Sequence, residues 1–415
     1  MREPIYKSRP VEPNPARYGG ERINDFIVMS QAFSNAYLIE TPRGNVQLNA
    51  GMGMEAPVIA ANFREFSDAA LHTLIFTQGH VDHVGGTAYL RENNPGLRVI
   101  ASDKNAEHQD YDKRLAAFRG NRSAFAFTDK FAEAFAYYQE HGYTDFPTQD
   151  QPTPDVLVED KLVFELGGVI FEIIAVPGAE TNDSLIVWLP QHKICFTGNL
   201  FGCPFGHFPN LVTIRGDRYR EALVVARAVE TVRALEPEMI CYGHHGPVIG
   251  RQLIQDELTA LYQAIHHVHD ETVKGMNEGK EVYTLMSEIS LPAEMEVGEG
   301  YGKVSWSVRA IWESYGGWFH HRSTTELYAV PQSSVAGDIV ELSGGAAAIL
   351  QRAQEKFASG HNEEALHLLD IVRDADADTT ESRALGVRIH EALLKRTDNF
   401  WLSSWLKNEI KGLQA

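Results

Sequence analysis

Short β-rich runs alternate with longer amphipathic stretches from Phe26 to about Pro247, and this alternation constrains the fold more than any other feature. The runs are rich in branched and aromatic residues, and many of them end in Gly, Pro or Asn turns, as β-strands do. Strands interleaved with helices form sheets covered by helices, so we predict an α/β layered domain. The expected strands are DFIVMS, NAYLIET, NVQLNAG, LHTLIFT, RVIASD, VIFEIIAVPG, SLIVWLP, KICFTGN and EMICYG.

Helical patterns accompany these strands and then replace them. Within the α/β part we expect helices over 56–70, 84–94, 103–117, 128–141 and 217–235. After about residue 250 the strand patterns stop, and LIQDELTALYQAIHHVHDETVKGM predicts one long helix. The stretch from AAAILQRAQ to HEALLK predicts two or three antiparallel helices.

Three parts follow from this organisation. We expect a proline-rich extended arm over 1–20, laid over a neighbouring subunit, because MREPIYKSRPVEPNPARYGG has neither strand nor helix periodicity. An α/β domain should occupy 21–255, and a helical domain should occupy 256–415.

Charge and cysteine content narrow the classes of function. The formal net charge is −19 without any block of Lys or Arg, which argues against a nucleic-acid partner. No apolar stretch approaches the ~20 residues that cross a bilayer, and the N-terminus lacks the apolar core of a signal peptide. The cysteines Cys195, Cys203 and Cys241 are odd in number and form no CxxC, which fits a reducing cytoplasm.

The segment IFTQGHVDHVGG carries the strongest chemical signal. A buried strand runs directly into Gln78, His80, Asp82 and His83, and VGG then opens a helix. Imidazole and carboxylate ligands at this spacing suit Zn, with Fe or Mn as alternatives. The competing interpretation is a polar turn with surface histidines.

Three later loops favour the metal interpretation, because each follows a predicted strand, where the ligands of open α/β domains gather. Glu180 follows a Pro-Gly turn in IIAVPGAETN, and Asn199 ends KICFTGN. His244 and His245 follow a third strand in EMICYGHHGPV.

Order, spacing and strand context of the four loops resemble the metallo-β-lactamase fold. A Glu after the PG turn, together with YGKVSWSVRAIWESYGGWF, resembles its alkylsulfatase branch and that branch's dimerisation domain. The resemblance implies an αβ/βα sandwich followed by an all-α dimerisation domain. It also implies a homodimer with the aromatic-rich WSVRAIWESYGGWF as a buried seam.

The resemblance also implies two groups of metal ligands. His80 and Glu180 would belong to a first site, with Gln78 in place of that site's first His. Asp82, His83 and His245 would form a second site. His245 is preferred to His244 because its HGP matches the family without a gap.

Two departures from the family pattern fall on the same side of the site. Gln78 replaces a His, and Asn199 stands where the family has a bridging carboxylate. A neutral amide is a poorer zinc ligand, and two adjacent cations need bridging negative charge. We therefore expect one ion rather than two.

Activity is expected from a metal-activated water. Asp82 would ligate the ion and orient that water, and Glu180 would act as general base if it does not bind metal. Tyr242 or His207 would protonate the leaving group. The alternative is a metal-poor member of the fold with a binding or non-hydrolytic role.

Substrate recognition is expected from NLVTIRG, where Asn210, Thr213 and Arg215 match the alkylsulfatase pattern. Arg215 would clamp an anion or, alternatively, form a structural ion pair. The resemblance implies an alkyl sulfate ester, with a carboxylic ester, lactone or thioester as alternatives. Aromatic residues of the 103–150 insert either line an entrance for this small, partly apolar substrate or pack in the core: Phe125, Phe127, Phe131, Phe135, Tyr137 and Tyr138.

Overall fold

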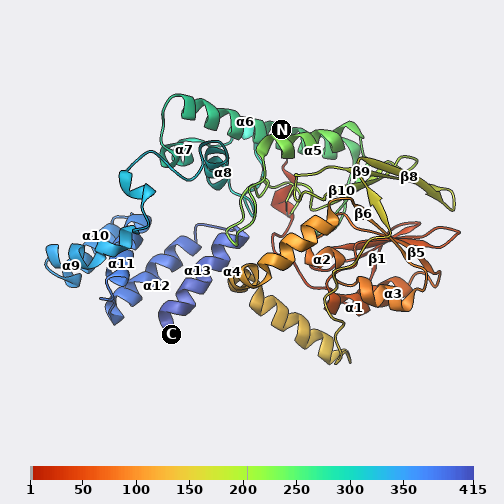
Figure 1. Ribbon diagram of the computed structural model, residues 1–415, viewed down its shortest axis with the longest axis horizontal. Helices are drawn as coiled ribbons and strands as arrows, with labels where there is room; N and C mark the ends of the chain where they lie inside the picture. Colours follow the sequence, from red (N-terminus) through yellow and green to blue (C-terminus); the bar gives the residue numbers. More distant parts are fainter. Residues whose placement is uncertain (1–2, 203) are drawn as a thin grey trace. The chain divides into compact units, whose positions relative to one another are not determined.

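The computed structural model describes residues 3–202 and 204–415. They form two compact units, Met1–Tyr315 and Gly316–Ala415 (Figure 1). The described strands all lie in the first unit, and the second unit is helical. Cys203 lies outside the described residues, and the other two cysteines are buried and form no disulfide.

The first unit contains two mixed β-sheets. One sheet has seven strands in the order β1 to β7; its strands are antiparallel up to β4 and parallel from β4 onward. These strands are Glu21–Asn24, Ile27–Ser30, Ala36–Ile39, Asn45–Leu48, Leu71–Ile75, Arg98–Ser102 and Val156–Val158.

The second sheet has six strands in the order β13-β12-β11-β10-β9-β8. Only the β11–β12 pair is parallel among them. From β8 to β13 the strands are Lys161–Leu166, Val169–Ala175, Leu185–Leu189, Ile194–Gly198, Met239–Tyr242 and Val248–Ile249.

The two sheets pack face to face, and helices cover their outer faces. The inner layer joins Ile27, Ile39 and Ile75 of one sheet to Ile173 and Val187 of the other. Alternate residues of the same strands, which point to the opposite face, meet the helices. The covering helices are α1 (Ala56–Arg64), α3 (Thr87–Asn93) and α4 (Asn105–Glu140) on the first sheet, and α5 (Ala222–Ala234), α6 (Arg251–Asn277) and α8 (Val304–Gly316) on the second.

This αβ/βα layering and all nine predicted strands are confirmed. Sequence patterns missed β1, β7, β8 and β13, which are short or lie at sheet edges. The two helices expected over 103–117 and 128–141 are wrong, because α4 is one continuous helix. Gly120 lies within this helix, where a Cβ would meet nothing within 4 Å, so the glycine occupies an exposed helix position.

The boundary of the compact units lies later than residue 255. Helices α6, α7 (Val282–Glu288) and α8 belong to the first unit. Leu258, Leu261 and Val308 are buried in the same core cluster as residues of β10, β11 and α5. The long helix therefore completes the sandwich instead of opening the second unit.

The N-terminal arm makes its described hydrogen bonds to its own chain. A short 3-10 helix, Ile5–Ser8, begins it. The Ile5 N–H donates to Glu257 at 3.0 Å, and the Ala16 N–H donates to Glu55 at 2.9 Å. Contact between this arm and a neighbouring subunit stays a prediction.

The second unit packs its helices as antiparallel neighbours around a small core that contains Ala353, Ala365, Leu369 and Ile389. Its helices are α9 (Ala336–Leu342), α10 (Ala346–Ala358), α11 (Asn362–Asp374), α12 (Thr380–Leu394) and α13 (Phe400–Gln414).

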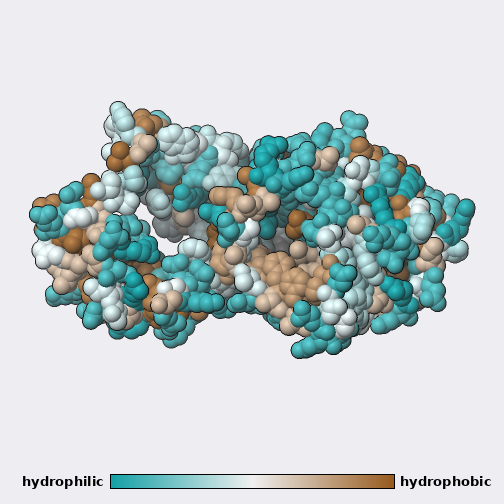
Figure 2. Space-filling view, turned by 60° about the horizontal axis from the view of Figure 1, so that its bottom comes forward, coloured by the Kyte–Doolittle hydropathy of each residue, from teal (hydrophilic) through white to brown (hydrophobic). Residues whose placement is uncertain are grey.

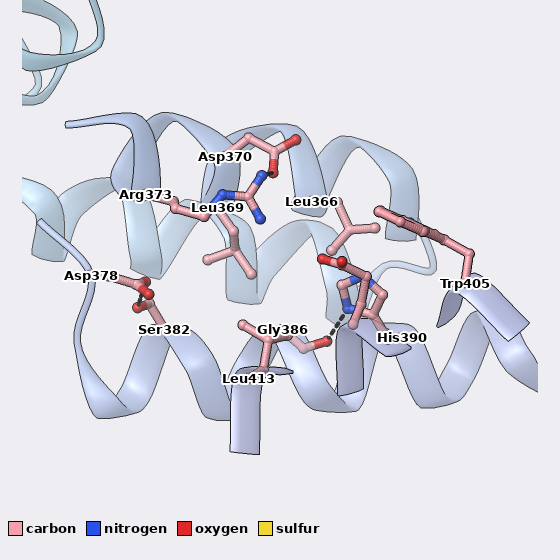
Figure 3. Close-up of a pocket in the computed structure, with 11 residues that line it drawn as sticks. Leu366, Leu369, Asp370, Arg373, Asp378, Ser382, Gly386, His390, Trp405 and Leu413 are labelled. Carbon is pink, nitrogen blue, oxygen red and sulfur yellow. Dashed lines mark hydrogen bonds and ion pairs between the residues drawn. The ribbon is translucent and has the colours of Figure 1, made fainter. Parts of the chain in front are cut away.

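A cavity of about 240 Å³ lies between α11, α12 and α13 (Figure 3). Arg373, Asp370, Ser382 and His390 of its lining make contacts within their own helices or caps. His390 Nδ1–H donates to the Gly386 carbonyl at 2.7 Å, and Arg373 pairs with Asp370 at 2.6 Å. These contacts within the helices account for the polar side chains in the lining, so we assign the cavity no function.

Hydrophilic residues predominate on the face shown in Figure 2, and apolar residues gather there only in smaller groups. No single described helix is long and apolar enough to cross a membrane. One bent pair, Gln332–Leu342 with Ala346–Ala358, passes such a test by length and composition alone.

Glu55 is a fully buried carboxyl at the start of α1 that joins three segments. It accepts backbone hydrogen bonds from Ala16, Phe33 and Met52 at 2.9 to 3.0 Å. These donors favour the anion, but burial outweighs them and raises the Glu55 pKa to about 7. The folded state therefore binds a proton more tightly than the unfolded state.

This pKa predicts a specific pH dependence of stability. The contribution of Glu55 is fully present below pH 4.5 and is lost as pH rises toward 7, by about 3 kcal/mol at ~1.4 kcal/mol per pKa unit. Chemical denaturation of wild type and of Glu55→Gln between pH 4.5 and 7.5 measures it. The unfolding free energy of the wild type should fall relative to that of the variant, and parallel curves would contradict the assignment.

Candidate metal centre

The loop after β5 is held against the 181–184 turn by close contacts at Gly79. A Cβ on Gly79 would lie 2.8 Å from Asp183 Oδ2 and 2.9 Å from Asn105 Nδ2. Asn105 Nδ2 donates to Asp183 Oδ2 at 2.9 Å, so the glycine packs against a fixed polar pair. Only a residue without a side chain lets the loop approach so closely.

His83 is fully buried and its ring is oriented by hydrogen bonds. The Thr77 hydroxyl donates to Asn49 Oδ1, which leaves its oxygen free to accept from His83 Nδ1 at 3.1 Å. The proton of the neutral ring then lies on Nδ1, and the lone pair lies on Nε2. Nε2 faces the Asn199 amide at 3.2 Å and the Asp82 carboxylate at 3.9 Å.

Gln78 contacts His80 directly instead of standing alone in the site. Its amide nitrogen lies 2.6 Å from His80 Nδ1, which therefore accepts, so the proton of the neutral ring lies on Nε2. This Nε2 is buried with no hydrogen-bond partner among the described residues. Burial lowers the pKa of both His80 and His83, so both rings are neutral, as metal ligands must be.

Asn199 reaches the same place from the end of β11. Its Oδ1 is buried without a partner among the described residues and packs against Gly243, where a Cβ would lie 1.8 Å away. Its Nδ2 contacts His83. The side chain therefore sits between the loop after β5 and the turn after β12.

The two histidines after β12 have different surroundings. Burial lowers the pKa of His244 strongly, with further contributions from the charges of His245 and His83. Burial and the nearby Arg9 lower the His245 pKa to about 4. The neighbouring charges therefore favour His244 over His245 as the histidine that would bind a metal together with His83.

Glu180 is held by an arginine that sequence analysis did not identify. Arg220 pairs with the Glu180 carboxylate at 3.0 Å and donates from Nε to the Glu180 carbonyl at 2.8 Å. A third contact joins Arg220 to the Asn210 carbonyl. Burial raises the pKa of Glu180, while Arg220 opposes the shift. In this structure, therefore, Glu180 is an ion-pair partner.

A polar network from α4 borders the loop after β5. The His80 and His108 rings are 5.1 Å apart, and His108 Nε2 lies 3.7 Å from the Asp112 carboxylate. Arg119 contacts Asp112 and pairs with Asp217 at 3.2 Å. Sequence analysis missed these residues, since only His108 and Asp112 are one helical turn apart and Asp217 comes from a distant segment.

The network continues from Asp217 back to Glu180. Asp217 lies 4.0 Å from Arg220, and it accepts a hydrogen bond from Tyr111 at 3.0 Å. A cavity of about 120 Å³ is lined by residues of this network and by the 178–182 turn.

The predicted substrate residues lie close to this network. Arg215 is near enough to His80 to contribute to the lowering of its pKa. Thr213 and Asn210 are buried, and their Oγ1 and Oδ1 atoms have no hydrogen-bond partner among the described residues. The segment RGDRYR is dense in arginine, and this is the sequence feature that could have pointed to Arg220.

Both predicted proton donors hold backbone segments. The Tyr242 hydroxyl contacts the Gly202 carbonyl and accepts the Phe201 N–H at 3.1 Å, which fixes the turn after Asn199. His207 Nδ1 accepts the Gly300 N–H at 2.9 Å. These contacts give both side chains a structural role, and leaving-group protonation by either stays a prediction.

The aromatic residues of the insert divide between core and surface. Tyr138 is fully buried, and Phe131 and Tyr137 pack against the same core cluster. Phe135 is 37% exposed and packs on Phe146 with ring centroids 5.0 Å apart. Phe125 and Phe127 are half-buried on the same helix. The core interpretation therefore holds for the buried half of the set.

The donor chemistry fits a divalent cation. Neutral imidazoles, a carboxylate and an amide oxygen come from the loops after β5, β11 and β12, and Asn199 Oδ1 is a buried acceptor that lacks a partner among the described residues. As they stand, no three His, Cys, Asp or Glu side chains in residues 3–202 and 204–415 are grouped tightly enough to hold an ion. The Asn199–His83 contact would have to open to admit one.

The family comparison decides the assignment. The sequence model described as "Metallo-beta-lactamase superfamily" matches residues 30–244, more than half of the chain. The chain belongs to this superfamily. A second model, "Alkyl sulfatase dimerisation", matches residues 284–413. The superfamily implies a divalent metal site and hydrolase chemistry, and the predicted resemblance is confirmed.

Similar proteins include sulfatases. The chain is 24% identical over 382 residues to a linear primary-alkylsulfatase of Pseudomonas sp., covering 89% of this chain and 72% of that one. It is 23% identical to an alkyl/aryl-sulfatase of Saccharomyces cerevisiae, covering 83% and 55%. A stereoselective inverting sec-alkylsulfatase from Pseudomonas sp. superposes with a TM-score of 0.81 at 20% identity, covering 95% and 66%. This chain thus spans only part of its relatives' length.

Proposed function

We propose that this protein hydrolyses a sulfate ester of a small, partly apolar alcohol at the centre formed by the loops after β5, β11 and β12. The alkylsulfatase relatives support the substrate class. The observation that carries the proposal is the position of Arg215, a cation close to His80, because a sulfate ester is anionic whereas a lactone or carboxylic ester is neutral.

The metal that this family implies would lower the pKa of a bound water and polarise the ester oxygen. We propose Asp82, His83 and His244 as its main ligands, with His80 and Asn199 alongside. We prefer His244 to His245 because the charge of His83 contributes to the pKa of His244, whereas the charge of Arg9 contributes to that of His245. Thr77 keeps the His83 proton on Nδ1, so that Nε2 presents its lone pair to the site.

The remaining residues bind and orient the substrate. Arg215 would bind the sulfate oxygens, and Asn210 and Thr213 would supply polar contacts through atoms that are buried without a described partner. The Arg220–Glu180 pair fixes the 178–180 turn and the Asn210 carbonyl. Asp82, which is 22% exposed at its side chain, is the carboxylate positioned to orient water.

We propose one zinc ion rather than two. Glu180 is paired with Arg220, and Gln78 and Asn199 carry no charge. The double variant Gln78→His with Asn199→Asp should raise the zinc content from about one toward two ions per chain. Metal analysis after zinc reconstitution tests this, with Asn199→Asp alone as the control. An unchanged stoichiometry would contradict our interpretation of both positions.

We propose a homodimer located in the cytoplasm. The dimerisation-domain match and the exposure of Trp318 (71%) and Tyr315 (59%) support the dimer. The buried free thiols of Cys195 and Cys241 are consistent with a reducing compartment. The sulfatase relatives and the superfamily match favour hydrolysis over the non-hydrolytic alternative.

A further inference from the structure

Arg9 binds the turn that carries the candidate histidines. Its guanidinium donates from one terminal nitrogen to the Gly246 carbonyl at 2.9 Å and from the other to the Pro247 carbonyl at 2.9 Å. The residue is half-buried and comes directly after the 3-10 helix of the arm. A contact between the N-terminal arm and the turn after β12 is not required by the sandwich itself.

The turn needs such support because its backbone is strained. His245 has a φ of 60°, in the left-handed region that non-glycine residues rarely adopt. Conformations of this kind persist only where the surrounding structure holds them. Asn35 provides part of that hold: its Nδ2 donates to the His245 carbonyl at 2.7 Å, and its backbone N–H donates to the Gly243 carbonyl at 2.6 Å.

Arg9 supplies hydrogen bonds to the remaining part of the turn. Asn35 binds the carbonyls of Gly243 and His245, whereas Arg9 binds the next two along the chain. Arginine suits this task because its planar guanidinium presents two donors in a fixed fork, and a lysine ammonium does not.

Other contacts fix the arm, so that Arg9 is presented in one place. The Ile5 N–H donates to Glu257 on α6 at 3.0 Å, and the Tyr6 hydroxyl donates to Glu296 at 2.6 Å. Lys7 also pairs with Glu296 at 3.1 Å, but both side chains are largely exposed, so this pair contributes little to fixing the arm. The segment thus ties α6 and the 296 loop to the histidine turn.

We propose that Arg9 is a positioning residue, and that residues 5–9 form a strap which holds the His244–Pro247 turn in the geometry required for metal binding. The existence of the strap is supported by the hydrogen bonds of Ile5, Tyr6 and Arg9. Its consequence for metal affinity rests on the proposed function. The role is a positioning one, because Arg9 acts through the turn.

Three full-length variants test the strap: Arg9→Ala, Arg9→Lys and, as the matched control in the same arm, Lys7→Ala. The first readout is hydrogen–deuterium exchange of residues 242–249 in metal-free protein. We expect exchange there to be about tenfold faster in Arg9→Ala, intermediate in Arg9→Lys and unchanged in Lys7→Ala. The second readout is zinc affinity by competition with a chelator, which should be about tenfold weaker in Arg9→Ala.

Each outcome decides one proposal. Unchanged exchange in Arg9→Ala overturns the strap, and faster exchange with unchanged zinc affinity overturns its positioning role. If Arg9→Ala does not fold, Arg9→Lys against Lys7→Ala gives the same comparison. If wild-type protein binds no zinc, the proposed function fails, while the exchange measurement still decides the strap.

Discussion

Replacing Asp82 by alanine is expected to lower the rate of sulfate-ester hydrolysis by about 10²–10⁴-fold, the range for a group that acts on the reacting water. Asp82 is the partly exposed carboxylate of the loop after β5, and it lies 3.9 Å from His83 Nε2. Without it the centre loses both an anionic ligand and the acceptor that orients water. The measurement is sulfate release from a linear alkyl sulfate at saturating zinc.

Two comparisons separate this loss from misfolding. Asp82→Asn preserves the shape of the side chain but removes its charge, and it should lose nearly as much activity. Asp110→Ala removes an exposed carboxylate of α4 and should behave as wild type. Thermal unfolding of all three variants should match the wild type within a few degrees. Asp82→Ala that keeps activity within tenfold of wild type would refute the role given to this residue.

Arg215→Ala should separate anionic from neutral substrates. Truncating one partner of a buried charge-assisted contact costs about 3–4 kcal/mol, so kcat/KM for an alkyl sulfate should fall by about 10²–10³-fold. A neutral carboxylic ester of the same alcohol makes no such contact, and its hydrolysis should change little. The measurement is kcat/KM for both esters in the wild type and the variant.

The control for charge is Arg227→Ala, which removes an exposed arginine of α5 and should change neither substrate. Arg215→Lys should recover only part of the loss, because one ammonium cannot replace the planar fork of donors. Equal losses for the sulfate and the neutral ester would mean that Arg215 is structural, as one partner in the ion-pair network of Asp217 and Arg220.

Local patterns in the sequence predicted most of the fold. Each predicted strand is a run rich in β-branched or aromatic residues, and many of these runs end in Gly, Pro or Asn. These are local properties of the sequence that do not depend on distant segments. The two helices expected over 103–117 and 128–141 are one helix, α4, because Gly120 between them costs a helix only about 1 kcal/mol, which the rest of α4 outweighs. The edge strand β13 is two residues long and has no periodicity to read.

The candidate site was predictable where its residues follow strands, as His80 and Asp82 follow β5. The ion-pair partners were not, because they come from distant segments. Arg220 removes Glu180 from the expected ligand set, and Arg9 reaches the turn after β12 from the N-terminal arm. Neither contact has a sequence spacing that signals it. The surroundings of His244 and His245 likewise depend on the backbone conformation of the turn after β12, in which His245 has a positive φ.

The central claim is that one cation is held by side chains from the loops after β5, β11 and β12. Metal analysis of purified, zinc-reconstituted protein tests it most directly, beside Asp82→Ala treated in the same way. We expect about one zinc per chain in the wild type and substantially less in the variant, with hydrolysis following zinc content. A wild-type protein that binds no zinc yet hydrolyses the ester at full rate after chelation would contradict the account.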